Sequence, residues 1–123
     1  MFLLAQAADW LCDMSATIKA NVHSGVLVTS GGGGIGTAVG TAAEFARAKT
    51  LARCAALDVL ALHSYAPPSE IDRQLEGYSG AMAGTGKRLI LQEWGVQGAN
   101  STQQAVAFRA TAAMIVSSFL RAA

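Results

Sequence analysis

The sequence is short of charged residues. They make up 14% of its 123 residues, whereas a typical globular domain has about 25%. Nine basic and eight acidic side chains leave a net charge of +1, with no block of like charge. This balance provides no electrostatic footprint for nucleic acid or for an anionic membrane, so neither is an expected partner. With 52% hydrophobic residues, the chain is expected to fold as one unit over residues 1–123 rather than to be disordered.

Long apolar runs are also missing. Asp9, Asp13 and Lys19 interrupt the first candidate, so no stretch reaches the roughly 18 residues that a membrane span needs. The start of the chain lacks the basic segment and the long apolar run of a secretory signal, and we expect a helix there instead.

Cysteine is scarce, with only Cys12 and Cys54 in the chain. Their spacing matches no set of metal ligands, and a single possible pair does not make a disulfide framework. The sequence therefore predicts no metal and no cofactor, and it leaves the redox state of the two thiols open.

Helical spacing of apolar residues predicts four helices, over residues 2–20, about 41–56, 69–82 and from 101 onward. Ser69 with Asp72, and Ser101 with Gln104, have the spacing of helix caps. In the first helix the spacing marks one apolar face, made of Leu3, Ala7, Trp10, Met14 and Ile18. In the last helix it marks a face made of Ala105, Phe108, Ala112, Ile115 and Phe119.

Three short apolar runs predict strands at residues 25–30, 58–62 and 88–92. Their continuous apolarity is typical of a parallel sheet covered by helices. The strand ends at Ser30, His63 and Glu93 recur at about the length of a βα module, roughly 30 residues. We therefore expect an α/β fold of order α-β-α-β-α-β-α, about three βα units of a TIM barrel preceded by a helix. A complete (β/α)8 barrel needs about 250 residues.

In such a barrel the active-site residues follow the carboxyl ends of the strands, which selects Ser30, His63, Tyr65 and Glu93. Glu93 is the strongest catalytic candidate, because a carboxylate at the end of an apolar strand needs partners or a task. His63 and Tyr65 lie two residues apart, so both side chains point the same way if the strand continues. The alternatives are a structural anion at Glu93 and a structural histidine at His63. Trp94 could stack on a sugar or pack at the barrel rim.

The glycine-rich run Gly31-x-Gly33-x-x-Gly36 formally fits a dinucleotide fingerprint. That fingerprint needs an acid at the end of the next strand, whereas Asp58 stands at the start of its strand. A flexible loop is the favoured interpretation, and a nucleotide-binding domain using Gly31–Gly36 is the alternative. A second alternative is a non-enzymatic interaction module whose open strand edges pair with another chain.

The segments Leu57–Tyr65 and Gly86–Gly95 resemble the sixth and seventh strands of glycoside hydrolase family 5, the cellulase and β-mannanase family. Upstream, Trp10, Ile18-Lys19 and Leu27–Gly31 resemble the fourth helix and fifth strand of that family. The resemblance covers residues 10 to about 98. It implies that the chain runs from helix 4 to helix 7 of the family's barrel.

The resemblance implies that Glu93 is the nucleophile, that Tyr65 orients it and that His63 positions substrate or the acid/base group. Ser30, Gly31 and Trp94 would contact the substrate. The implied activity is retaining hydrolysis of a β-linked polysaccharide, a β-mannan or β-glucan, and family members act outside the cell. A retaining enzyme also needs a second carboxyl group about 5–5.5 Å from the first. The family carries it in an Asn-Glu motif upstream of the matched segments, so this chain alone is expected to be inactive.

Overall fold

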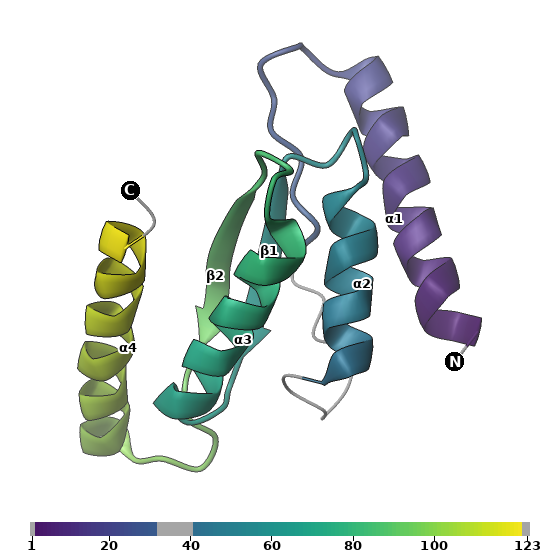
Figure 1. Ribbon diagram of the computed structural model, residues 1–123. Helices are drawn as coiled ribbons and strands as arrows, with labels where there is room; N and C mark the ends of the chain where they lie inside the picture. Colours follow the sequence, from purple (N-terminus) through teal and green to yellow (C-terminus); the bar gives the residue numbers. More distant parts are fainter. Residues whose placement is uncertain (1, 32–40, 122–123) are drawn as a thin grey trace.

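The computed structural model describes residues 2–31 and 41–121, and the side chains of 6–31 and 41–113. These residues form a mixed α/β arrangement of four helices and a two-stranded parallel sheet (Figure 1). In chain order the elements are α1 (Phe2–Asn21), α2 (Ala42–Ala52), β1 (Val59–Ser64), α3 (Pro68–Met82), β2 (Arg88–Trp94) and α4 (Ser101–Arg121).

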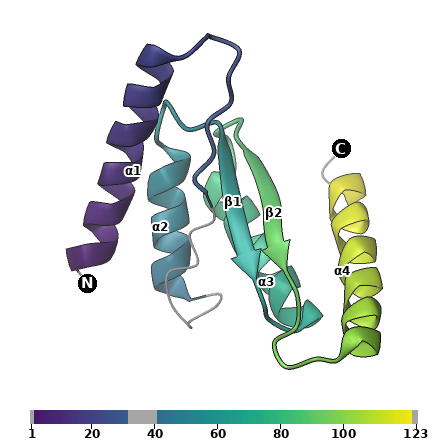
Figure 2. The same ribbon diagram turned by 180° about the vertical axis from the view of Figure 1, so that it is seen from behind.

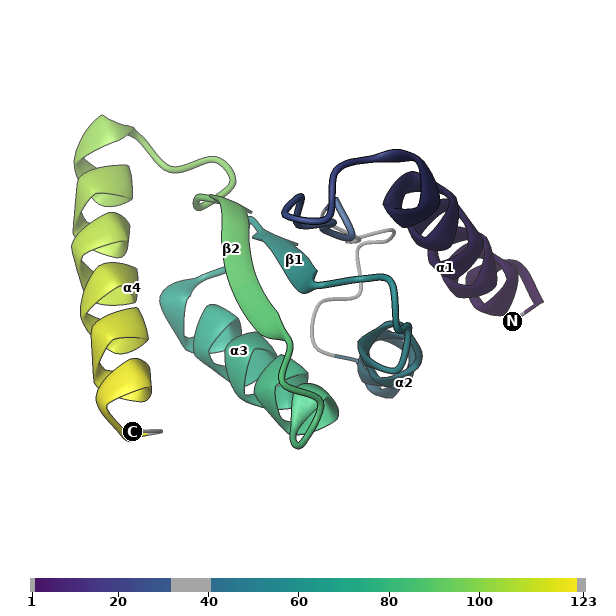
Figure 3. The ribbon, with the colours of Figure 1, turned by 90° about the horizontal axis from the view of Figure 1, so that it is seen from above.

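The two strands run parallel, as predicted, and α3 connects them in a βαβ unit. Helices α2 and α3 lie on one side of the sheet (Figure 3). Most of β1 is buried, whereas the residues of β2 from Arg88 to Gln92 alternate between exposed and half-buried. Leu89 and Leu91 pack into the core, whereas Ile90 is 40% exposed. Successive side chains of a strand point to opposite faces, and no described element covers the face that Ile90 occupies.

The predicted strand at residues 25–30 forms only in part. Thr29 makes an isolated parallel bridge with Val59, and the Ser30 amide donates to the Val59 carbonyl at 3.0 Å. Val26 and Leu27 are exposed, and no other described segment pairs with this stretch. The segment therefore runs beside β1 without becoming a regular strand.

The apolar face that the spacing marks on α1 is not the face turned to the core. Trp10 is 61% exposed, and Met14 and Ile18 are each 39% exposed. The side of α1 that faces the core carries smaller residues instead: Ala8, Leu11, Cys12 and Ser15. Ser15 is buried as well. Its hydroxyl is satisfied there, since it donates to the Leu11 carbonyl one turn earlier, at 2.7 Å. Helix α1 lies beside α2 (Figures 1 and 2).

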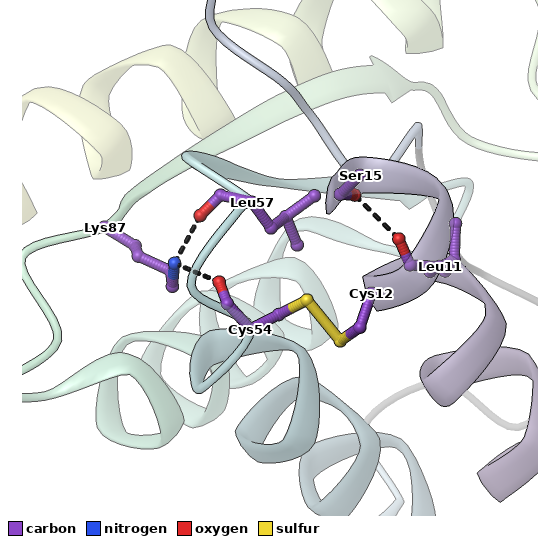
Figure 4. Close-up of a disulfide and its surroundings, with 6 residues drawn as sticks. All are labelled: Leu11, Cys12, Ser15, Cys54, Leu57 and Lys87. Atoms are coloured by element: carbon purple, nitrogen blue, oxygen red, sulfur yellow. Dashed lines mark hydrogen bonds between the residues drawn. A yellow bond between two sulfur atoms is a disulfide. The ribbon is translucent and has the colours of Figure 1, made fainter. Parts of the chain in front are cut away.

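A disulfide between Cys12 and Cys54 explains this orientation of α1 (Figure 4). The two Cα atoms lie 5.5 Å apart, with a sequence separation of 42 residues. The carbonyl of Cys54 also accepts a hydrogen bond from the Lys87 ammonium at 2.6 Å, and the same ammonium donates to the Leu57 carbonyl. The disulfide thus joins α1 to the segment that follows α2. Lys87, just before β2, binds the backbone of the same segment.

A second link holds the end of α1 to the sheet. The Lys19 ammonium lies 2.6 Å from Asp58 Oδ2, and the Val28 amide donates to that oxygen at 2.7 Å. The hydrogen bond from Lys19, followed by the one from Val28, lowers the pKa of the Asp58 carboxyl below its usual value. Asp58 therefore has a structural role at the amino end of β1.

Helices α2 and α3 begin and end differently from the prediction. Thr41 caps α2 by accepting from the Glu44 amide at 3.3 Å, and the helix ends at Ala52 rather than near residue 56. Helix α3 begins at Pro68 with Pro67 in the cap position, so the expected cap at Ser69 is wrong. Proline suits the first helical position because the amide it lacks would have no partner there.

The cap of α4 lies one residue earlier than predicted. The Asn100 side chain accepts from the Gln103 amide at 3.0 Å, and the Gln103 side chain accepts from the Asn100 amide at 2.9 Å. This is a reciprocal capping box, which replaces the expected pair Ser101 and Gln104. Gln104 instead pairs with both backbone groups of Val96, at 3.0 and 2.6 Å.

The packing face of α4 also differs from the prediction. Ala107 and Thr111 are buried, whereas Phe108 is 41% exposed and Ala105 is exposed. The buried positions, Ala107 and Thr111, thus lie one residue before Phe108 and Ala112 of the apolar face that the spacing indicates.

Helices α2 and α3 meet at a glycine. A Cβ added to Gly77 would lie 2.1 Å from a ring carbon of Phe45, so the helices approach this closely only because Gly77 has no side chain. The Phe45 ring meets Tyr78 edge-on, with centroids 6.2 Å apart. Burial, followed by the charge of Glu44, raises the pKa of the Tyr78 hydroxyl to about 12, and that hydroxyl donates to Glu44 at 3.1 Å.

Candidate active site

Three of the predicted site residues meet at the carboxyl ends of the two strands. His63 stands near the end of β1, Tyr65 directly follows it, and Glu93 lies opposite His63 on β2. The Tyr65 hydroxyl donates to Glu93 Oε2 at 2.9 Å. Nδ1 of His63 lies 3.5 Å from the same oxygen. The three side chains therefore form one cluster around a single carboxylate oxygen.

An irregularity in the sheet aims the side chains of this cluster. Leu62 pairs with Leu91, but the next residue, His63, pairs with Glu93, so Gln92 is an extra residue on β2. Such a bulge redirects side chains and is common beside active sites. Here it allows two adjacent residues of β2 to reach the same imidazole: Gln92 Oε1 lies 3.2 Å from His63 Nε2, and Glu93 faces Nδ1.

Gln92 was not among the predicted site residues. A regular strand would place Gln92 and Glu93 on opposite faces, and the bulge does not show in the residue types alone. The available signal was a pair of adjacent polar residues, Gln92 and Glu93, at the end of an otherwise apolar run.

The backbone that carries Tyr65 is held by the loop after β2. The Gly95 amide donates to the Ser64 carbonyl at 3.1 Å, and the Gln97 amide donates to the Tyr65 carbonyl at 3.4 Å. The pairing between the two chain segments thus continues past the ends of the regular strands. As a result, Tyr65 lies beside Glu93 although it is outside β1.

The electrostatics of the cluster keep the Tyr65 hydroxyl protonated, as a hydrogen-bond donor to Glu93. Its hydrogen bond to Glu93, followed by the negative charge of Glu93, raises the pKa of the Tyr65 hydroxyl. The cluster is open to solvent, because Tyr65 is 56% exposed and the Glu93 side chain is 52% exposed. An open carboxylate with an oriented hydroxyl beside it is accessible to a polymeric ligand.

The predicted substrate contacts lie apart from this cluster. Ser30 is buried, and its hydroxyl accepts from the Ala61 amide at 2.9 Å, so it serves to hold the extended segment against β1. Gly31 follows with a positive φ of 61°, a conformation that favours glycine. The Trp94 ring packs against Phe108 of α4, with ring centroids 4.3 Å apart. Trp94 therefore packs against α4.

The structure describes the positions of all eight carboxylate residues of the chain, and seven of them lie elsewhere. They are Asp9 and Asp13 on α1, Glu44 on α2, Asp58 before β1, and Glu70, Asp72 and Glu76 on α3. Glu70, in the first turn of α3, is paired with Arg73. Over residues 2–31 and 41–121, no group of three or more His, Cys, Asp and Glu residues is placed to hold a metal ion.

A concave region lies at the opposite ends of the strands from this cluster. A depression of about 330 Å³ is lined by residues that include Leu27, Ala55, Asp58, Thr85 and Lys87. The charged groups of Asp58 and Lys87 are bound to the main chain there, so both residues have a structural role.

Most of the glycine-rich motif, residues 32–36, lies outside the described residues, as does the rest of the segment 32–40. Asp58 is the acid nearest to the position that a dinucleotide-binding fold requires. Its carboxylate already binds the Lys19 ammonium and the Val28 amide. None of the described helices is long and apolar enough to span a membrane.

The chain was compared with models of protein families, with curated proteins and with solved structures. No match was found in any of the three.

Proposed function

We propose that this chain carries the nucleophile half of a retaining glycoside hydrolase site, of the kind found in family 5, and acts on a β-mannan or β-glucan. The observation that carries this proposal is the hydrogen bond from Tyr65 to Glu93 at the carboxyl ends of two parallel strands. The parallel strands, with α2 and α3 on one side (Figure 3), support the further proposal that the chain forms part of a TIM barrel.

In this mechanism the Glu93 carboxylate attacks the anomeric carbon of the sugar. The bond from that carbon to the leaving oxygen breaks, the oxygen takes a proton from an acid, and a glycosyl ester forms on Glu93. A water molecule then attacks the same carbon, gives a proton to the conjugate base of that acid, and releases Glu93. The Tyr65 hydroxyl binds Oε2, so it orients the carboxylate and leaves Oε1 to attack.

The proton for the leaving group needs a second carboxyl group near Glu93. The other seven carboxylates lie on α1, α2 and α3 or before β1. We therefore expect this chain by itself to turn over unactivated polysaccharide negligibly, since protonation of the leaving group contributes about 10²–10⁴-fold.

The proposal can be tested without the acid by using an activated substrate. A 2,4-dinitrophenyl 2-deoxy-2-fluoro-β-glycoside has a leaving group that needs no proton, and its fluorine slows hydrolysis of the ester. Incubation with mannose- and glucose-configured probes, followed by peptide mass spectrometry, should find one label, on Glu93. Glu93→Gln should take no label, while Glu76→Gln, a change at an exposed glutamate of α3, should label like the wild type.

Tyr65→Phe should be labelled about tenfold more slowly, because it loses one charge-assisted hydrogen bond to the nucleophile. Absence of label from the folded wild type, or a label on another residue, would refute the proposal. Circular dichroism of each variant shows whether a loss of labelling has another cause.

A second candidate function is association with another protein surface, favoured by the apolar side chains that stay exposed. Trp10 on α1, Leu27 beside β1 and Val106 on α4 are each more than 60% exposed. Scattered exposed apolar residues are ordinary on a protein surface. Large apolar side chains exposed on two helices and on the segment beside β1 suggest contact surfaces. We expect a second copy of the chain to cover them. Light scattering at about 100 µM protein should then show a defined oligomer, and a monomer at this concentration would contradict this candidate.

A further inference from the structure

His63 is held at both ring nitrogens by adjacent residues of β2. Nε2 lies 3.2 Å from Gln92 Oε1, and Nδ1 lies 3.5 Å from Glu93 Oε2. The bulge in β2 makes this possible, because it adds Gln92 to the strand opposite the step from Leu62 to His63. Without the extra residue, Gln92 and Glu93 would point to opposite faces of the sheet.

The orientation of an imidazole ring needs such partners. The torsion that turns the ring is broad and roughly two-fold, so side-chain geometry alone does not decide which nitrogen faces Glu93. The hydrogen bond at one nitrogen decides the proton at that atom and the role of the other nitrogen. An amide oxygen only accepts, so the contact with Gln92 Oε1 requires a proton on Nε2 and turns Nδ1 toward Glu93. The Glu93 carboxylate also only accepts, so the contact at Nδ1 requires a proton on that nitrogen as well.

We propose that Gln92 is a positioning residue of the candidate site. By accepting a hydrogen bond from Nε2–H of His63, it holds the imidazole with Nδ1 toward Glu93 Oε2, the oxygen that Tyr65 also binds. The inference rests on the proposed function, since it assigns Gln92 a role in presenting the proposed nucleophile. Gln92 itself contacts the histidine and acts on Glu93 through it.

The test compares three variants. Gln92→Met keeps the length of the side chain and removes the acceptor, whereas Gln92→Glu keeps an acceptor at the same length. Gln6→Met makes the same change at an exposed glutamine of α1, and serves as the matched control. His23 is the only other histidine of the chain and is exposed, so its ring provides an internal reference in every spectrum.

The first readout is the imidazole N–H signal in proton–nitrogen NMR spectra. We expect the Nε2 proton of His63 to be protected from exchange with water in the wild type, Gln6→Met and Gln92→Glu. In Gln92→Met it should exchange as fast as the ring protons of His23. The second readout is the labelling of Glu93 by the activated fluoroglycoside, which Gln92→Met should slow about three- to tenfold, as expected for loss of one neutral hydrogen bond.

The two readouts separate this inference from the proposed function. If Gln92→Met changes neither the His63 signal nor the labelling rate, the positioning role is refuted. If the His63 signal changes but the rate does not, Gln92 holds the ring without serving the nucleophile, and the inference is again refuted. If the wild type takes no label, the proposed function fails, and the His63 signal alone decides whether Gln92 orients the imidazole.

Discussion

The disulfide between Cys12 and Cys54 gives the sharpest test of the fold, because it fixes α1 to the rest of the chain. Replacing both cysteines by alanine removes the crosslink and leaves no unpaired thiol. Helix α1 would then be held mainly by its contacts with α2 and by the ion pair between Lys19 and Asp58. The ion pair contributes little, since both of its side chains are partly exposed.

The size of the effect follows from the length of the closed loop. A crosslink over a separation of 42 residues removes chain entropy from the unfolded state, and the usual relation gives about 4 kcal/mol at 25 °C. Small domains have a free energy of unfolding of about 5–15 kcal/mol. The loss would therefore be a large share of the total, and the double variant should unfold at a markedly lower denaturant concentration.

The assay is equilibrium unfolding in urea, followed by circular dichroism, with and without a dithiol reductant. We expect the reductant to destabilise the wild type about as much as the double substitution does, and to leave the double variant unchanged. Mass spectrometry after alkylation of the unreduced protein should find no free thiol. Two alkylated cysteines, or a loss of less than about 1 kcal/mol, would show that the loop-closure argument does not apply.

Three further outcomes follow from the packing. Gly77→Ala should lower the free energy of unfolding by about 1–3 kcal/mol, because the added methyl group collides with Phe45; an unchanged midpoint in urea would contradict this. Asp58→Asn should destabilise the chain most near neutral pH. The pKa of this carboxyl is lowered by Lys19 in the folded state, so its contribution is complete above about pH 4 and is lost as the pH falls further. Urea midpoints from about pH 6 to pH 2 should converge for the two proteins, and a constant difference would refute this. Lys87→Met should cost about 1–3 kcal/mol, measured in the same way, since two carbonyls near β1 lose their donor.

The amino-acid sequence determined the class of local structure with few errors. The apolar runs at 58–62 and 88–92 are strands, the pairing is parallel, and four helices occur in the predicted order. These features depend on side-chain periodicity and on turn residues, which are local properties. Cap positions were off by two residues at Pro67, where Pro68 begins the helix without a side-chain cap. They were off by one residue at Asn100, where neighbouring polar residues offer competing caps.

The tertiary structure decided which faces are buried. Spacing alone favoured the face of α1 with Trp10 and Met14, but the helix turns Cys12 and Ser15 inward. A pairing between residues 42 apart leaves no periodic signal in the sequence. Similarly, residues 25–30 have the composition of a strand but make only one bridge, because a strand needs partners on its edges and the composition does not supply them.

The candidate site shows the same division. Residue type and position at strand ends were enough to select His63, Tyr65 and Glu93, because the carboxyl ends of parallel strands meet at one edge of a sheet. They also selected Ser30, whose hydroxyl instead accepts a hydrogen bond from the Ala61 amide. Only the bulge in β2 shows that Gln92 joins the cluster. A one-residue change of register reverses which face a side chain occupies, and the register is a property of two strands together.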